Sequence, residues 1–176
     1  MKRIDIDPGR LLLPAVSVWA NQWFLLASGD VAKKDYNCMT VAWGGLGAMW
    51  GKPLAMVVVR PSRHTWGFME RCDSFTLSAF GEEHRKALSY CGGHSGRDGD
   101  KVKACGLTPI SSRTVRSPGF DEARLILECR KTYFSDMDPS HFLDPSIEGN
   151  YSGKDYHRIY FGEILAVSGT PDWQKP

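Results

Sequence analysis

A short segment with two arginines and two hydroxyl groups, Arg60-Pro61-Ser62-Arg63-His64-Thr65, contains the residue types that bind an anion. It follows the apolar run Leu54–Val59, which is typical of a buried strand, and Ser62 is placed to cap a helix through Trp66–Glu70. Free backbone N–H groups at a helix start and fork-shaped arginine donors match phosphate oxygens. The segment therefore predicts a phosphate site. The alternative is a solvated helix cap with two surface arginines.

A glycine-rich segment at residues 91–101 carries Arg97 and Lys101. Glycines let backbone amides turn inward around an oxyanion, and Lys101 would add a point charge. The lysine is not followed by Ser or Thr, so this is not a Walker loop, and the last glycine of a hydrolase elbow is missing. The segment predicts either a second anion-binding element or a flexible surface turn in which Asp98 and Asp100 pair with the two cations.

The segment 36–50 combines small and polar residues, such as Thr40 and Ala42, that would let a flat ring approach a strand closely. Gly45–Trp50 imitates the start of a dinucleotide-binding fingerprint, but it ends in Trp, and Lys52-Pro53 follows where a helix should run. A Rossmann turn is therefore not expected. The alternative for this segment is a hydrophobic strand and hairpin packed by its tryptophans.

The elements that must position these residues are mostly short strands. Hydrophobic runs predict strands over residues 15–20, 23–27, 39–43, 54–60, 74–80, 123–132 and 158–167. Helices are expected over Glu82–Tyr90, with Gly92 as its stop, and over Asp100–Ala104. Because the strands arrive in runs rather than alternating with long helices, we expect a mainly β fold, an antiparallel β-barrel with helical insertions. It should form a single domain over residues 1–176, with its core at about 10–170.

Composition narrows the class of protein. The chain has 176 residues, 42% of them hydrophobic and 24% charged, with a formal net charge of +2 at pH 7. This balance is too mild to indicate nucleic acid or an anionic membrane as a partner. No stretch approaches the roughly 20 apolar residues of a membrane helix, and early charges interrupt a secretory signal, so we expect a cytoplasmic protein.

The five cysteines are scattered along the chain without a C-x-x-C pair. An odd number of widely spaced cysteines indicates free thiols in a reducing compartment. Cys91 and His94 have a spacing found at zinc sites, but no second close pair accompanies them. We therefore expect no metal site.

Taken together, these segments resemble the flavin reductase-like family, the FMN-binding split β-barrel proteins that include flavoredoxin. The similarity covers most of residues 36–165, and its motifs follow one another in the family's order. The similar segments are Asn37–Gly44, Lys52-Pro53, Val59–Thr65, Phe75-Thr76, Ser95–Asp98 with Lys101, Gly106–Pro109, Asp138-Pro139, Phe142–Asp144 and Asp155–Ile164. The last three are similar to the flavoredoxin branch.

The resemblance implies a six-stranded split barrel that forms a homodimer, with FMN near the subunit interface. The residues implied to bind the FMN phosphate are Arg60, Ser62, Arg63 and Thr65, with Ser95, Gly96 and Lys101 as second contributors. Those implied to line the flavin ring are Asn37, Met39, Thr40, Val41 and Ala42, with Thr40 nearest the reactive N5. His157 and Tyr160 are candidate catalytic residues on the substrate side, the alternative being that both are structural.

The activity implied by the resemblance is an NAD(P)H-dependent flavin reductase, in which hydride passes from NADH or NADPH to flavin N5 and the electrons leave to an unidentified acceptor or partner protein. The alternative is a flavoredoxin-like electron carrier with tightly bound FMN and no catalysis of its own. A third alternative is a barrel that has lost its cofactor and serves as a binding module.

Overall fold

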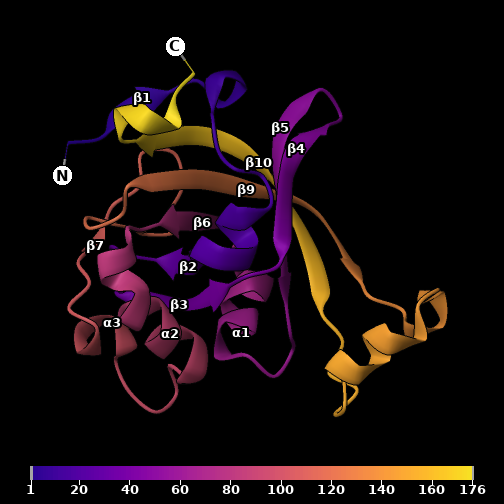
Figure 1. The fold of residues 1–176 in the computed structure, drawn as a ribbon. Coiled ribbons are helices and arrows are strands. Elements are labelled where there is room, and N and C mark those ends of the chain that lie inside the picture. Colours follow the sequence, from indigo (N-terminus) through magenta and orange to yellow (C-terminus); the bar gives the residue numbers. More distant parts are fainter. Residues whose placement is uncertain (1, 176) are drawn as a thin grey trace.

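One eight-stranded antiparallel sheet organises the chain (Figure 1). The computed structural model describes residues 2–175, so residues 1 and 176 of the expected domain lie outside it. The strand order is β3-β2-β6-β9-β10-β5-β4, and β1 pairs with β10. The strands of this sheet are β1 (Ile4–Ile6), β2 (Phe24–Asp30), β3 (Asp35–Val41), β4 (Gly44–Met49), β5 (Lys52–Val59), β6 (Ser74–Ala79), β9 (Leu125–Asp136) and β10 (Arg158–Gly169). The predicted mainly β fold is confirmed.

Both faces of strand β2, which lies between β3 and β6, are buried. Phe24 and Leu26 belong to one hydrophobic cluster, and Leu25 and Ala27 belong to another, as the two-residue period of a strand requires. Short elements complete the fold around these clusters. They are α1 (His64–Arg71), α2 (Arg85–Gly93), α3 (Lys101–Ala104), β7 (Pro109–Ile110), β8 (Gly119–Phe120) and the single-turn or irregular helices Pro8–Arg10, Val18–Gln22, Glu82–His84, Pro139–His141, Pro145–Asn150 and Pro171–Trp173. Within residues 2–175, none of the helices is long and apolar enough to span a bilayer.

Two predicted helix boundaries are wrong. The N-cap of α1 is Arg63 rather than Ser62, and the Arg63 side chain makes no capping hydrogen bond. α2 continues through Gly93, so Gly92 does not stop it. A glycine can remain helical when the next turn is held by a backbone bond, here from His94 N to the Tyr90 carbonyl over 3.0 Å.

The strand predicted over residues 15–20 is also wrong, because Val18–Gln22 forms an irregular helix. Local backbone bonds hold it, including Val18 N to Pro14 O over 3.0 Å. Trp19 is buried by this turn and packs on Phe24 with ring centroids 4.7 Å apart. Tertiary packing therefore overrides the β propensity of Val and Trp here. The other predicted strands are present with shifted ends.

The β4–β5 hairpin turns at Trp50 and Gly51, both with positive φ. It matches the hairpin interpretation of segment 36–50. The expectation that the tryptophans pack this hairpin is wrong, however, because Trp43 and Trp50 are 47% and 59% exposed.

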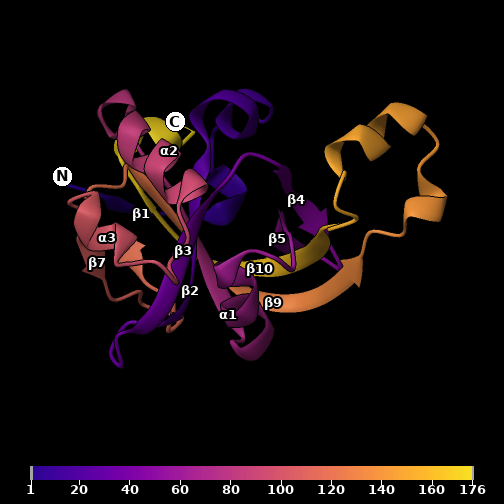
Figure 2. The same cartoon turned by 90° about the horizontal axis from the view of Figure 1, so that it is seen from below.

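A long excursion between β9 and β10, residues 137–157, projects away from the sheet (Figures 1 and 2). We call it the arm. A backbone bond of 3.0 Å from Met137 N to His157 O closes its base, and Leu143 at its far part is almost fully exposed. Arg60 reaches the arm by donating to the Asn150 carbonyl over 2.9 Å. The arm therefore meets the body close to the arginine-rich turn after β5.

Candidate functional site

A narrow cavity of about 180 Å³ lies along the end of β3, and we call it the strand-edge pocket. Its lining consists of Met39, Thr40, Val41, Ala42, Trp43, Val58, Arg60 and His157. The structure thus brings together four of the expected ring-side residues. Asn37, the fifth, lies earlier on β3 and does not line this pocket.

Thr40 ties the pocket wall to α2. Its hydroxyl donates to the Leu88 carbonyl over 2.5 Å, and a Cβ on Gly92 would lie 3.3 Å from the Cβ of Thr40. The close approach of α2 to β3 at Gly92 therefore fixes the Thr40 side chain. Its hydroxyl proton is engaged, so toward the pocket it can act only as an acceptor.

A second cavity of about 150 Å³ lies where α1 begins, and we call it the cationic pocket. Three cationic side chains line it, and none of the carboxylates in the described part of the chain does. Its full lining is Ser62, Arg63, His64, Thr65, Gly93, His94, Ser95, Arg97 and Lys101. The glycine-rich segment and the Arg60–Thr65 segment, far apart in sequence, therefore meet around one cavity.

Lys101 is the strongest sign that this cavity suits an anion. It is only 5% exposed, and its Nζ donates to the carbonyls of Cys91 and His94 over 3.1 and 3.2 Å. Within residues 2–175 it forms no ion pair with a carboxylate. An ammonium has three donors, so one proton is left for a ligand. Burial lowers the pKa of Lys101, as expected for a charge that lacks a counterion.

Arg63 and His64, like Lys101, have pKa values lowered by burial, and neighbouring cations lower them further. Burial and the neighbouring Arg60 lower the pKa of Arg63. Burial, followed by the cations Arg97 and Lys101, lowers the pKa of His64. Because every one of these shifts disfavours positive charge, an anion in the pocket would relieve them.

The loop between α2 and α3 is tight at Gly96, which lies between two lining residues of the cationic pocket, Ser95 and Arg97, and itself lines a neighbouring cavity with Asn37 and Lys101. A Cβ there would lie 2.2 Å from Asn37 Oδ1 and 3.2 Å from a ring carbon of His64. Ser95 shapes the same turn, because its hydroxyl accepts the backbone N–H of Arg97 over 3.2 Å. Only glycine lets the backbone come this close, and such a cradle of amides and cations fits a phosphate group.

Several hydroxyl and amide groups expected at the ligand are engaged elsewhere. Asn37 donates its side-chain amide to the Thr65 hydroxyl over 2.7 Å, and Thr65 donates to the Cys38 carbonyl over 3.2 Å. The backbone N–H and hydroxyl of Ser62 both donate to the Asp155 carboxylate on the arm. These side chains position the start of α1 rather than presenting free donors. Arg63 donates to the Gly92 carbonyl and Arg97 to the Ser62 carbonyl over 3.3 Å, so the other N–H groups of these two guanidiniums and one proton of Lys101 are left for an anion.

Arg60 and His157 belong to the strand-edge pocket rather than the cationic pocket. Burial, followed by Arg60, lowers the pKa of His157 to about 4 against a smaller opposing effect of Asp155. His157 is therefore neutral at pH 7. Tyr160 is fully buried and its hydroxyl donates to Glu70 over 2.5 Å. The structure separates Tyr160 from both pockets and places it in the core.

Trp43, His64 and Arg97 line the pockets and Tyr151 contacts His157, although the sequence predicts no individual site role for any of these four residues. Arg97 could have been found from its place in the glycine-rich segment, and His64 from its place at a helix start. Tyr151 lies in no motif, and it reaches His157 only because the arm folds back on its own base. Such a contact has no signal in local sequence.

The thiols carry no sign of activation. All five cysteines are free, and Cys91 Sγ lies 3.8 Å from that of Cys105. Hydrogen bonding with the Cys38 thiol, followed by burial, raises the pKa of Cys91, which keeps it protonated. In the described part of the chain, no three His, Cys, Asp or Glu side chains gather into a group that could hold a metal ion.

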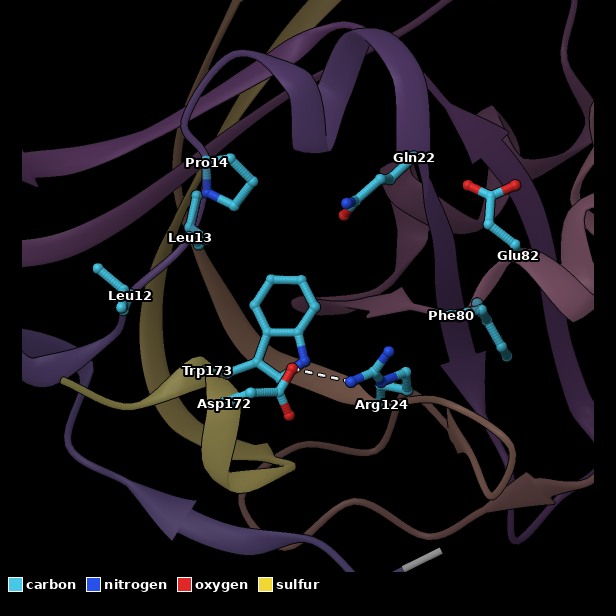
Figure 3. A pocket seen from close by; sticks show the side chains of 10 residues that line it. Leu12, Leu13, Pro14, Gln22, Phe80, Glu82, Arg124, Asp172 and Trp173 are labelled. Atoms are coloured by element: carbon cyan, nitrogen blue, oxygen red, sulfur yellow. Dashed lines mark hydrogen bonds and ion pairs between the residues drawn. The ribbon is translucent and has the colours of Figure 1, made fainter. Parts of the chain in front are cut away.

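A larger cavity of about 500 Å³ lies between the N-terminal segment and the end of the chain (Figure 3). Apolar side chains of Leu12, Leu13 and Pro14 face the Trp173 ring across it, and Asp172 pairs with Arg124 at 2.8 Å on its border. It contains none of the residues singled out from the sequence.

Three solved structures illustrate what this fold is similar to. Flavoredoxin of Desulfovibrio vulgaris (Miyazaki F) is 22% identical with a TM-score of 0.66, covering 92% of this chain and 73% of that one. A putative flavin reductase with a split barrel domain from Shewanella frigidimarina is 17% identical with a TM-score of 0.67, covering 90% and 73%. An NADH:FAD oxidoreductase of Streptomyces globisporus C-1027, solved with NAD and FAD fragments, is 16% identical with a TM-score of 0.64, covering 85% and 75%.

At these identities the likeness shows the fold, and that fold is the split barrel of flavin reductase-like proteins. Among curated proteins, none matches the chain. The sequence itself matches the family described as Flavin reductase like domain over residues 20–175. Since this match spans nearly the whole chain and both pockets, the chain belongs to the flavin reductase-like domain family.

Proposed function

We propose that this chain is an FMN-binding oxidoreductase of the NAD(P)H-dependent flavin reductase type. The observation that supports this most is a pair of pockets joined by one turn, in which Arg63 N donates to Arg60 O over 3.0 Å. The cationic pocket has no carboxylate among its described lining residues, and the strand-edge pocket is a narrow cavity along the end of β3. FMN has the matching parts, a phosphate at one end and a flat ring at the other.

In this proposal Arg63, Arg97 and Lys101 bind the phosphate. Within residues 2–175 none of the three forms an ion pair, so binding a dianion would lower the cost of burying Lys101 and half-burying Arg63, while the exposed Arg97 would add its charge from the solvent side. The backbone amides of His64 and Thr65 at the start of α1, and those around Gly96, add donors. Ser62, whose hydroxyl is held by Asp155, orients the turn.

The ring would lie against residues 39–42 of β3, where small side chains leave the backbone accessible. Thr40 would present oxygen lone pairs to a ligand N–H, because its proton is donated to Leu88. Arg60 would place a permanent positive charge at the same pocket and stabilise negative charge on a ligand. A bound FMN would supply the hydride-accepting N5 and the onward transfer of electrons, with NADH or NADPH as donor.

The two arginines provide the sharpest test of cofactor placement. We expect Arg63→Met to weaken FMN binding by about 1.5–3 kcal/mol, the usual loss for a charge-assisted hydrogen bond, and to leave riboflavin binding unchanged, since riboflavin has no phosphate. Arg60→Met should weaken the binding of both FMN and riboflavin, because Arg60 lines the pocket proposed for the ring that the two ligands share. Fluorescence titration of each variant with FMN, FAD and riboflavin measures this.

Arg71→Met is the matched control. Arg71 lies at the other end of α1 and pairs with Asp35 on the surface at 2.7 Å, so its loss should leave all the affinities unchanged. Equal FMN affinity in the Arg63 variant and the wild type would refute the proposed phosphate site. A wild-type protein that binds no flavin would refute the function.

Catalysis is tested by anaerobic mixing of the FMN-loaded protein with NADH and with NADPH. A reductase should lose its flavin absorption in the visible region rapidly with at least one of them. A flavoredoxin-like carrier would bleach slowly or not at all without its partner enzyme, and that result would overturn the reductase assignment while preserving the flavin site.

We also propose that the chain forms one domain and acts as a homodimer in the cytoplasm. The single sheet that joins strands from Ile4 to Gly169 supports the first part. The exposure of Trp43 at the strand-edge pocket leaves room for a second chain to cover it, and free thiols suit a reducing compartment.

A further inference from the structure

Tyr151, on the arm, is buried beside His157 and makes the only hydrogen bond to the imidazole within residues 2–175. The Tyr151 hydroxyl oxygen lies 2.8 Å from His157 Nδ1, and the two rings meet edge to face at 80° with centroids 5.5 Å apart. His157 in turn lines the strand-edge pocket and lies 5.2 Å from the Trp43 ring. Nε2 is therefore the ring nitrogen left for a ligand.

The Tyr151 hydroxyl has one proton and two acceptors within reach. The sulfur of Met137 lies 3.3 Å away, slightly farther than Nδ1 of His157. A thioether is a weak acceptor and an imidazole nitrogen is a strong one, so the hydroxyl proton goes to Nδ1. A neutral imidazole that accepts at Nδ1 carries its own proton on Nε2.

The charges around His157 keep the imidazole neutral. Arg60 lines the same pocket, and its guanidinium lies 5.0 Å from the centre of the Tyr151 ring. Asp155, two residues before His157, opposes this effect, but its carboxylate is engaged by Ser62. Burial and Arg60 prevail, so protonation at both nitrogens is disfavoured at neutral pH.

We propose that Tyr151 is a positioning residue, which holds His157 as the Nε2–H tautomer so that a neutral donor faces the strand-edge pocket. This rests on the proposed function for its ligand. The pocket would then offer two different groups, the charge of Arg60 and a neutral N–H donor at His157. Such a donor recognises a neutral acceptor such as a carboxamide or ketone oxygen, the class to which the nicotinamide carboxamide belongs.

The tautomer can be tested on the ligand-free protein. In protein labelled with ¹⁵N-histidine, long-range proton–nitrogen correlation spectra distinguish a protonated from an unprotonated ring nitrogen. We expect His157 to show unprotonated Nδ1 and protonated Nε2 at pH 7. Tyr151→Phe keeps the ring but removes the hydroxyl, and should shift His157 toward a mixture of tautomers.

Two further variants serve as controls. Tyr156→Phe removes a hydroxyl from a neighbouring ring 5.0 Å from Tyr151 that bonds Glu148 instead of His157, so the tautomer should not change. Met137→Leu removes the competing acceptor and should also leave it unchanged. The inference would be overturned if His157 were protonated at Nδ1 in the wild type. It would also be overturned if Met137→Leu changed the tautomer of His157, or if Tyr151→Phe left that tautomer unchanged.

A second readout uses the FMN-loaded protein. Tyr151→Phe should lower kcat/KM for the nicotinamide by about three- to tenfold, the loss expected for one misplaced hydrogen bond, with FMN affinity unchanged. Tyr156→Phe should match the wild type. Unchanged kcat/KM in Tyr151→Phe would refute the positioning role, whereas a protein that binds no flavin refutes the proposed function and leaves the tautomer result standing.

Discussion

Lys101, Arg63 and His157 are each buried or half-buried and form no ion pair with a carboxylate among residues 2–175, and each has a pKa shifted against its charged form. Residues of a stable core avoid this arrangement, because an uncompensated charge costs free energy. The two cations border the cationic pocket, and His157 borders the strand-edge pocket. At the scale of single residues, the two cations lie where an anion would offset the cost of their burial, and His157, which is neutral at pH 7, offers an uncharged group to the other pocket.

Because the pKa of His157 is lowered in the folded chain, the free energy of unfolding should depend on pH. Its pKa of about 4 in the folded chain is below the ordinary value of 6.5, so the unfolded chain takes up the proton first as pH falls. We expect the free energy of unfolding to decrease between about pH 6.5 and pH 4, by roughly 3 kcal/mol from this group. His157→Asn should remove that part of the decrease, as measured by urea unfolding across this range.

His141→Asn is the control, since His141 is an exposed histidine on the arm. Its stability profile should run parallel to that of the wild type. A His157→Asn profile that also runs parallel to the wild type would show that the imidazole protonates as easily in the folded chain as in the unfolded one.

At the scale of elements, local sequence predicts strands well where hydrophobic runs are bounded by clear turns, as at β5 and β6. It fails at residues 15–20, where Trp19 becomes buried against Phe24 and the chain closes local backbone bonds instead. Local sequence also misplaces the N-cap of α1, because the Ser62 hydroxyl donates to the carboxylate of Asp155 on the arm, 93 positions away. These outcomes depend on contacts that propensity does not contain.

Two glycines on neighbouring elements should respond oppositely to alanine. Gly96 lies in the loop between α2 and α3, and a Cβ there would displace Asn37, whose amide holds Thr65 at the start of α1. We expect Gly96→Ala to cost about 1–2 kcal/mol of stability and to weaken FMN binding. Gly67, within α1, has open space at its Cβ position, so Gly67→Ala should stabilise the protein by about 0.5–1 kcal/mol.

Thermal and urea unfolding measure the stability of the two alanine variants, and titration with FMN measures their affinity for the cofactor. Gly67→Ala should keep the FMN affinity of the wild type. If Gly96→Ala bound FMN with full affinity, the loop would not be part of the phosphate site, whatever its effect on stability.

At the scale of the whole molecule, the candidate site is assembled from four segments: β3, the turn after β5, the loop between α2 and α3, and the base of the arm. The residue types of the first three could be predicted, because each segment carries its own motif. Their division into two pockets could not, since Arg60 and Arg63 belong to one short segment of the sequence yet line different cavities. The contribution of the arm depends on how residues 137–157 return to the body (Figure 2).

The predicted homodimer belongs to this scale as well. Trp50, Tyr133 and Phe161 form an aromatic face on the hairpin and on β9 and β10, with ring centroids 5.6–6.5 Å apart. Trp50 and Tyr133 are exposed and Phe161 beside them is half-buried. A contiguous aromatic patch of this kind marks an interaction surface, whereas a single exposed apolar residue such as Val16 does not. We therefore expect the wild type to sediment as a dimer and the double variant Trp50→Glu with Tyr133→Glu to sediment as a folded monomer, because each carboxylate would be desolvated in the interface. Val16→Glu should remain dimeric. A wild-type monomer, or a double variant that stays dimeric, would exclude this face as the subunit contact.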